Sequence, residues 1–333
     1  MNRVPVSRRP LIRYSAALTL GLAAIGALAQ NGAQATASWP NKAVRIVVPL
    51  SPGGATDILA RSVGEVLQRE LKQPFVVDNR PGAGGNIGAE AIAKSAGDGY
   101  SLLIGLDTTF SINPFIYQSM PFKSTDLRPV MVIASQGSII VVNPKSGIRT
   151  LDELIAKGKK QALSMSSAGY GSPGHLGTAI LAHATGIKVN HVPYKGAAPA
   201  STAVVASEVD GGVLSATALA PNVNAGKATA LAITTAHRSP MLPNVPTVGE
   251  LGRKDLGTDV LLSMWAPAST PDALVRQIQQ ALLQAAKDPQ LQERLRNNDL
   301  YYEGLVGDAA ARRLQAQADR NRAVIQATGM KME

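Results

Sequence analysis

Short apolar runs rich in β-branched residues alternate along most of this chain with longer segments of helical periodicity. Strands are predicted at 44–50, 75–78, 102–105, 129–134, 138–142, 162–166, 188–192, 209–215, 228–234 and 260–265. After the first strand, apolar residues recur on one helical face at Leu59, Val63, Val66, Leu67 and Leu71. The alternation predicts an α/β fold with largely parallel strands.

Capping residues and prolines mark several helix boundaries. A helix is predicted at 173–185, and another at about 308–328. Thr270-Pro271-Asp272 places a capping threonine before a proline at the first helical position. This start predicts one long helix that runs to about Asn297.

The first 37 residues have the pattern of an export signal. A basic start is followed by an apolar run of 16 residues at 14–29, and small residues then recur at cleavage spacing, which favours cleavage after Ala37. The basic residues of this start are Arg3, Arg8, Arg9 and Arg13. A retained membrane anchor is the alternative, but the apolar run is short for a membrane span. We expect a periplasmic protein, and Arg8-Arg9 leaves the general and twin-arginine export routes both open.

Charge and composition exclude several classes of protein. The whole chain has a net charge of +10, and residues 38–333 keep 29 basic and 23 acidic residues, a net charge of +6. Basic residues are scattered and aromatic residues are few, so nucleic acid is not an expected partner. The absence of cysteine excludes disulfides, thiol catalysis and cysteine-ligated metals.

Two glycine-rich turns, each between a predicted strand and a predicted helix, are the main candidate site. The first covers Ser51, Gly53, Gly54, Ala55, Thr56 and Asp57, with Thr56 as the expected N-cap, and the second covers Gly84, Gly85 and Asn86. The first N–H groups of a helix lack partners and lie at the positive end of its dipole, so they bind anions. Two such turns side by side predict a cradle for a small carboxylate, although each alone is also compatible with an ordinary helix start.

Catalytic, metal and cofactor motifs do not assemble. Gly82-x-Gly84 with Gly88 and the later Asp107 resembles a dinucleotide fingerprint, but the last glycine is one residue too far along. The four histidines have no metal-ligand spacing, and neither a Gly-x-Ser-x-Gly elbow nor a Walker loop is present. We therefore expect no catalytic residue, no metal and no cofactor.

The order of motifs resembles the Bug-type family, the TctC-like periplasmic solute-binding proteins of tripartite tricarboxylate transporters. The resemblance covers nearly all of residues 38–333. It is carried by Ile46-Val47-Val48-Pro49, by 51–57 with Ala60-Arg61, by 79–90, Asp98-Gly99-Tyr100, Asn113-Pro114, 191–196, Ala225-Gly226-Lys227, Val245-Pro246-Thr247, 266–271 and Gly329-Met330-Lys331.

The resemblance implies a type II-like, two-lobed periplasmic binding-protein fold, with two α/β domains and a ligand cleft between them. We expect lobe 1 at 38–137 and 258–333 and lobe 2 at 138–257, with crossovers near Gln136 and Gly257. It implies that the two turns hold one carboxylate of a dicarboxylate, tricarboxylate or aromatic acid. The remaining ligand contacts are expected from Thr108, Thr109, Phe110, Ser167, Gly171, Ser172 and Ser215.

The implied partners are a small organic acid and a membrane permease or a sensor kinase. A protein that opens and closes on its ligand is most simply a monomer. An exported α/β hydrolytic enzyme that uses the same cleft is the alternative function.

Two departures from the family pattern bear on the ligand. Relatives often have Thr-His before an Ala-x-Asn-Pro stretch, whereas this chain has Thr109-Phe110-Ser111-Ile112 before Asn113-Pro114. Relatives also often have Phe-Asp in the second lobe, where this chain has Val213-Leu214-Ser215-Ala216. These changes predict a less polar distal pocket, so the far end of the ligand is expected to be apolar or aromatic.

Overall fold

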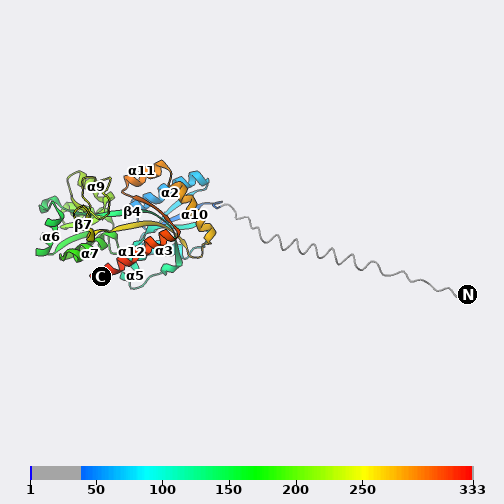
Figure 1. The fold of residues 1–333 in the computed structure, drawn as a ribbon, viewed down its shortest axis with the longest axis horizontal. Coiled ribbons are helices and arrows are strands. Elements are labelled where there is room, and N and C mark those ends of the chain that lie inside the picture. The colour runs from blue at the N-terminus through cyan, green and yellow to red at the C-terminus, as the bar shows by residue number, and fades with distance from the viewer. Residues whose placement is uncertain (2–38, 332–333) are drawn as a thin grey trace. The chain divides into compact units, whose positions relative to one another are not determined.

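The computed structural model describes residue 1 and residues 39–331, which fall into two units divided between Asn41 and Lys42. The fold described below is that of the second unit (Figure 1). The predicted signal peptide and its cleavage after Ala37 lie outside the described residues. No helix in the described part of the chain is long and apolar enough to span a membrane.

One mixed sheet organises residues 42–331, with strand order β2-β1-β3-β9-β4-β7-β5-β6 and with β8 and β10 also paired to β4. Its strands are β1 (Val44–Val48), β2 (Phe75–Asn79), β3 (Ser101–Leu106), β4 (Leu127–Val142), β5 (Leu163–Ser167), β6 (Val189–Pro193), β7 (Gly211–Ser215), β8 (Thr229–Ile233), β9 (Asp259–Pro267) and β10 (Tyr301–Val306). All ten predicted strand segments are confirmed, and β10 was not predicted.

Helices gather at both ends of the sheet. Figure 1 shows α2, α3, α10 and α11 toward one end and α6, α7 and α9 toward the other. The α-helices are α2 (Ala55–Leu71), α3 (Asn86–Ala93), α4 (Thr108–Ser111), α5 (Asn113–Ile116), α6 (Leu151–Lys160), α7 (Pro173–Thr185), α8 (Ala197–Ala206), α9 (Ala216–Asn224), α10 (Asp272–Ala285), α11 (Pro289–Asn297) and α12 (Gly307–Thr328).

The strand directions correct the expectation of a largely parallel sheet. β1 is parallel to β2 and β3, and β5 is parallel to β6 and β7, as helical crossovers require. The central strands β4 and β9 instead make only antiparallel pairs. They return the chain between the two parallel groups, which a local hydrophobic pattern does not reveal.

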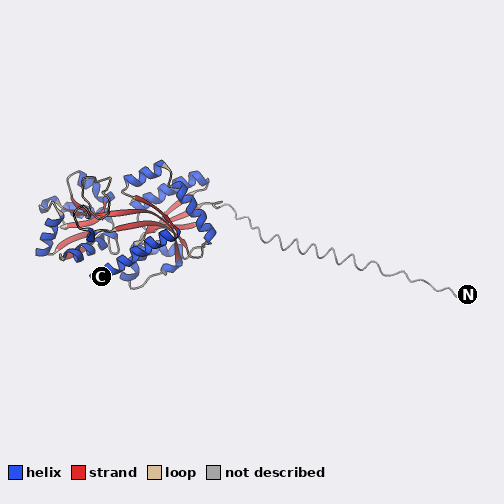
Figure 2. Ribbon diagram, in the orientation of Figure 1, coloured by secondary structure: helices blue, strands red, loops and turns tan. Residues whose placement is uncertain are grey.

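A single long strand, β4, belongs to both halves of the sheet (Figure 2). It pairs with β9 from Leu127 to Gly137 and with β7 from Ser138 to Val142. The sequence predicted two strands here because polar Ser135 and Gln136 interrupt the apolar pattern. Both residues are buried. The strand continues through them because pairing with β9 satisfies their backbone hydrogen bonds whatever the side chain.

The predicted helix from 272 to 297 is two helices, which is a second correction. Asp288 caps α11 by accepting a hydrogen bond from the Leu291 N–H at 2.9 Å, and Pro289 occupies the first turn. Proline cannot continue a preceding helix, so α10 ends at Ala285. Pro271, rather than Thr270, is the N-cap residue of α10.

Candidate functional site

The first glycine-rich turn connects β1 to α2. Gly54 is the N-cap and has no side chain to cap the helix, so the expectation that Thr56 would be the N-cap is wrong. In the described part of the chain, the backbone N–H groups of Ala55 and Thr56 have no hydrogen-bond acceptor. The residues from Ser51 to Gly54 are exposed, whereas Ala55 is half-buried and Thr56 is buried, so these donors lie just behind the exposed turn at the positive end of a helix dipole.

Asp57 fixes the shape of this turn. Its carboxylate accepts hydrogen bonds from the Gly53 N–H at 3.0 Å, Arg61 Nε at 3.0 Å and Asn79 Nδ2 at 2.9 Å. Burial opposes ionisation of Asp57, but the hydrogen bonds from Arg61, Gly53 and Asn79 outweigh it and hold the pKa below its usual value. Because both of its oxygens accept hydrogen bonds from the protein, the Asp57 carboxylate stabilises the turn itself. Its bond with Asn79 connects this turn to β2.

The second turn connects β2 to α3, and here the first helical N–H, that of Asn86, donates to the Ala83 carbonyl. Gly85 is the N-cap of α3, again without a side-chain cap, and Gly84 and Gly85 both have positive φ angles. A methyl group on Gly85 would lie 2.6 Å from Thr109 Oγ1, so only glycine fits there. Thr109 Oγ1 donates to the Gly84 carbonyl at 3.2 Å, which brings the predicted Thr108–Thr109 segment against this turn.

Phe110 packs into an aromatic group with Trp265 and Phe122. Its ring stacks on Trp265 with centroids 4.1 Å apart and meets Phe122 edge-on at 6.0 Å. Thr108 and Thr109 beside it are buried. The ring of Phe110 is thus committed to the packing of β9, and its predicted contact with a ligand stays a prediction.

A third loop, which runs from β5 to α7 and contains the predicted contacts Ser167, Gly171 and Ser172, rests on two stacked imidazoles. Ser167 Oγ lies 2.7 Å from His191 Nε2, and the Gly171 N–H donates to His175 Nδ1 at 3.3 Å. The two rings lie 3.9 Å apart and nearly parallel. Burial, together with the neighbouring His191, lowers the pKa of His175 to about 3, so this imidazole stays neutral and accepts from Gly171.

The third loop reaches the second turn through a residue that we did not predict. A methyl group on Gly171 would lie 2.9 Å from Asn113 Oδ1, and Asn113 Nδ2 donates to the Gly84 carbonyl at 3.0 Å. Asn113 was noted only as part of an Asn-Pro motif. Ser172 caps α7, and the hydroxyl of Ser215, at the start of α9, lies 3.1 Å from Thr217 Oγ1. The structure therefore brings the second turn, Thr109 and Gly171 together.

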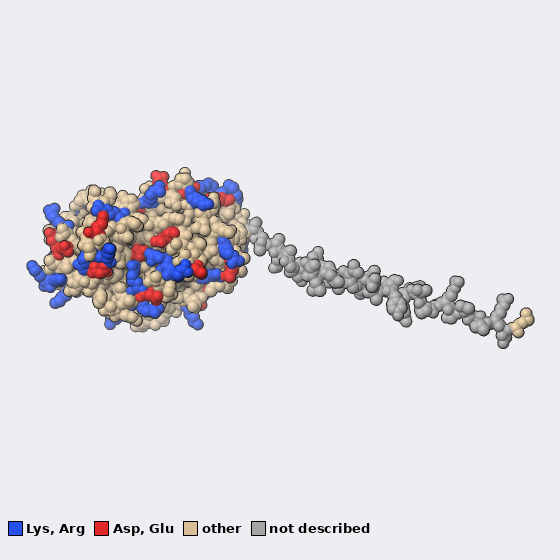
Figure 3. All heavy atoms as spheres, viewed as in Figure 1, with Lys and Arg blue, Asp and Glu red and all other residues tan. Residues whose placement is uncertain are grey.

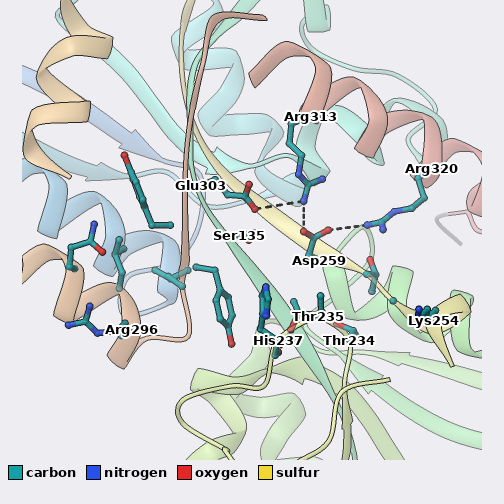
Figure 4. Close-up of a pocket in the computed structure, with 18 residues that line it drawn as sticks. Ser135, Thr234, Thr235, His237, Lys254, Asp259, Arg296, Glu303, Arg313 and Arg320 are labelled. Atoms are coloured by element: carbon teal, nitrogen blue, oxygen red, sulfur yellow. Dashed lines mark hydrogen bonds and ion pairs between the residues drawn. The ribbon is translucent and has the colours of Figure 1, made fainter. Parts of the chain in front are cut away.

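A cavity of about 730 Å³ lies elsewhere, and no predicted site residue lines it. Figure 4 shows Asp259 at its wall between Arg313 and Arg320, with Glu303 close to Arg313. His237 and Thr235 line the same cavity. A second cavity, of about 410 Å³, is lined by His175, His191 and the end of α12 beneath the third loop.

The mixed α/β sheet agrees with solved structures of two-lobed periplasmic binding proteins, and comparisons with known proteins also give the family of this chain. Residues 59–330 match the model of the "tripartite tricarboxylate transporter family receptor" family, TctC. This chain belongs to that family. It is a solute-binding protein and not an enzyme, so the alternative of an exported hydrolase is not supported.

Individual relatives agree with this assignment. Protein BugT of Bordetella pertussis is 36% identical over 253 residues, which cover 74% of this chain and 78% of BugT. The solved structure of R. palustris Rpa4515 with adipate has a TM-score of 0.81 at 31% identity, covering 88% of this chain and 99% of that one. The periplasmic binding protein BugD has a TM-score of 0.79 at 30% identity, covering 89% and 100%.

Proposed function

We propose that this protein captures a small organic carboxylate, a dicarboxylate, tricarboxylate or aromatic acid, in the periplasm. The observation that carries the proposal is the pair of helix starts at Gly54 and Gly85, neither of which has a side-chain cap. The Asp57–Asn79 hydrogen bond of 2.9 Å holds their two loops together. Two adjacent helix starts without side-chain caps favour one carboxylate, and the adipate bound by Rpa4515 supports this ligand class.

We propose that the lobes are 38–137 with 258–333, and 138–257. β4 and β9 would then connect them, because β4 changes its partner from β9 to β7 at Ser138. The predicted contacts from Thr108, Thr109 and Phe110 lie in the first lobe, and those from Ser167, Gly171, Ser172 and Ser215 in the second. Closure of the lobes would bring both sets to the ligand.

Delivery to a tripartite tricarboxylate permease is the proposed use of the bound acid, with a sensor kinase as the other candidate partner. The family description supports the permease. Basic and acidic side chains are interspersed on the face drawn in Figure 3, which gives no single charged patch there. Export with cleavage near Ala37 and a monomeric state complete the proposal.

A thermal-shift screen of residues 38–333 against mono-, di- and tricarboxylates and aromatic acids tests the ligand class. An acid at about a hundred times its dissociation constant should add about 2.7 kcal/mol to the free energy of unfolding. The departures at Phe110 and Ser215 predict that acids with an apolar or aromatic far end will bind better than short polar diacids. No stabilisation by any acid would overturn the proposal.

A substitution at Gly54 makes the same test specific to the helix start. A side chain there would have no atom within 4 Å, and an Asp in Gly54→Asp would cap α2 with its own carboxylate. We expect the variant to be as stable as the wild type or more so, yet to lose acid binding. Gln290→Glu adds the same charge to the first turn of α11 and should leave binding unchanged.

A further inference from the structure

Only the nitrogen of the Asn113 carboxamide makes hydrogen bonds with the described residues. Its Nδ2 donates to the Gly84 carbonyl at 3.0 Å and to Asn86 Oδ1 at 2.8 Å, so it is anchored to the second glycine turn. Its Oδ1 has no donor among the described residues, although Asn113 is fully buried. A buried acceptor without a partner is costly, and native proteins rarely keep one without a reason.

The unpartnered oxygen lies where the proposed ligand contacts meet. A methyl group on Gly84 would lie 3.3 Å from Asn113 Oδ1, and one on Gly171 would lie 2.9 Å from it. The same position on Gly84 is 2.9 Å from the Tyr117 hydroxyl, for which the described residues offer no hydrogen bond. Two polar atoms therefore converge on Gly84, beside the uncapped start of α3.

These atoms have a different chemistry from the helix starts. Backbone N–H groups attract a carboxylate, whereas an amide oxygen repels one and requires a donor. The Tyr117 hydroxyl can donate or accept, and burial raises its pKa, so it stays protonated. An acceptor beside an anion site suits a ligand with a hydrogen-bond donor on the carbon next to its carboxylate.

We propose that Asn113 Oδ1, assisted by Tyr117, selects acids that have a hydroxyl or amino group next to the carboxylate. The inference rests on the proposed carboxylate site and specifies which substituent the bound acid has next to its carboxylate. An acid without the donor leaves Oδ1 unpartnered in the closed protein. A site built for a hydrogen-bonding group discriminates strongly against the analogue that lacks it, so we expect at least a tenfold preference.

Matched acid pairs test the inference by calorimetry. Mandelate and phenylacetate differ by one hydroxyl, as do malate and succinate, so each pair isolates the donor. In wild-type protein the hydroxy acid should bind at least tenfold more tightly. Equal affinities within each pair would overturn the inference while the carboxylate proposal stands. Failure of all four acids and of the wider screen would overturn both.

Variants separate selection from support of the turn. Asn113→Leu removes the acceptor and should bring the ratio of dissociation constants within each pair close to one. Asn113→Asp keeps an acceptor, so it should keep the preference while it weakens both acids by charge repulsion. Tyr117→Phe keeps the ring and should reduce the preference in part. If Asn113→Leu weakened both acids of a pair equally, or if Asn113→Asp abolished the preference although it keeps an acceptor, Asn113 would be only a structural support.

Discussion

Asn79 Nδ2 donates a hydrogen bond to Asp57 Oδ1 at 2.9 Å and so joins the two glycine-rich turns. The same nitrogen donates to the Leu50 carbonyl at 3.1 Å. Arg61 also contacts both residues: its Nε donates to Asp57 Oδ2 and its Nη2 donates to Asn79 Oδ1, each at 3.0 Å. Three polar side chains therefore set the distance between the two helix starts.

Replacement of Asp57 should damage both stability and binding. In Asp57→Asn an amide nitrogen would face the Arg61 or Asn79 donors, and a buried hydrogen bond would be lost at a cost of about 1–3 kcal/mol. Urea unfolding should show this loss, and acid affinity should fall because the turns separate. Asp319→Asn, on the exposed side of α12, should change neither. An Asp57→Asn protein with wild-type stability would show that these hydrogen bonds contribute little.

Gly174 should tolerate no side chain, because α7 lies directly against β7. A methyl group there would lie 2.0 Å from the Val213 carbonyl oxygen, which belongs to the backbone and cannot rotate away. We expect Gly174→Ala to cost about 4 kcal/mol or more, in the exceptional range for one substitution. The matched change Gly249→Ala has its closest contact at 3.6 Å and should be nearly neutral. Chemical denaturation of the two variants decides the point.

Asp107 predicts a pH dependence of stability. Burial raises its pKa to about 6, against hydrogen bonds from the Leu261 N–H at 2.8 Å and Ser111 Oγ at 2.9 Å. A raised carboxyl pKa means that stability is lost as pH rises from about 4 to 6, by up to about 3 kcal/mol. Asp107→Asn should therefore gain stability relative to the wild type over that interval, as measured by urea unfolding at successive pH values.

Asp57 provides a contrast of opposite sign. Its pKa is lowered, so its contribution is present above the unfolded pKa and is lost as pH falls through the folded pKa. Relative to the wild type, Asp57→Asn should lose stability as pH rises. Parallel pH profiles for the Asp57 and Asp107 variants would contradict at least one of the two assignments.

The stack of Phe110 on Trp265 should be visible in fluorescence. Phe110→Ala removes a ring 4.1 Å from one of the two tryptophans and should change the emission while it costs about 3 kcal/mol. Phe115→Ala removes an exposed ring that faces Arg322 at 5.2 Å and should cost far less. Unchanged emission in Phe110→Ala would mean that the stack is not maintained in solution.

Local patterns predicted most elements because glycine, proline and β-branched residues act locally. The strand β10 was missed because Gly304 interrupts a run that includes Glu303, and a register shift between Tyr302 and Leu305 accommodates the break. The unity of β4 and the antiparallel centre depend on pairing between distant segments, and no local pattern contains that information.

The glycine turns were predictable because a turn from a strand into a helix follows from its own glycines, although Thr56 was wrongly expected to cap the first helix. The chemical role of Asp57 was not, since it depends on Arg61 and Asn79 and on the fold that brings β2 beside β1. Asn113 was missed for the same reason. Its burial and its unpartnered oxygen arise from packing against Gly84 and Gly171, which lie far from it in the chain.

The position of β9 has a consequence for how a growing chain acquires its structure. β3 and β4 follow each other in the chain, yet β9 lies between them in the sheet. Until synthesis passes Pro267, each of these strands has an open edge that nothing earlier in the sequence occupies. The N-terminal part cannot complete its sheet during most of translation, so the chain stays incompletely folded and open to chaperones until β9, in its last quarter, is made.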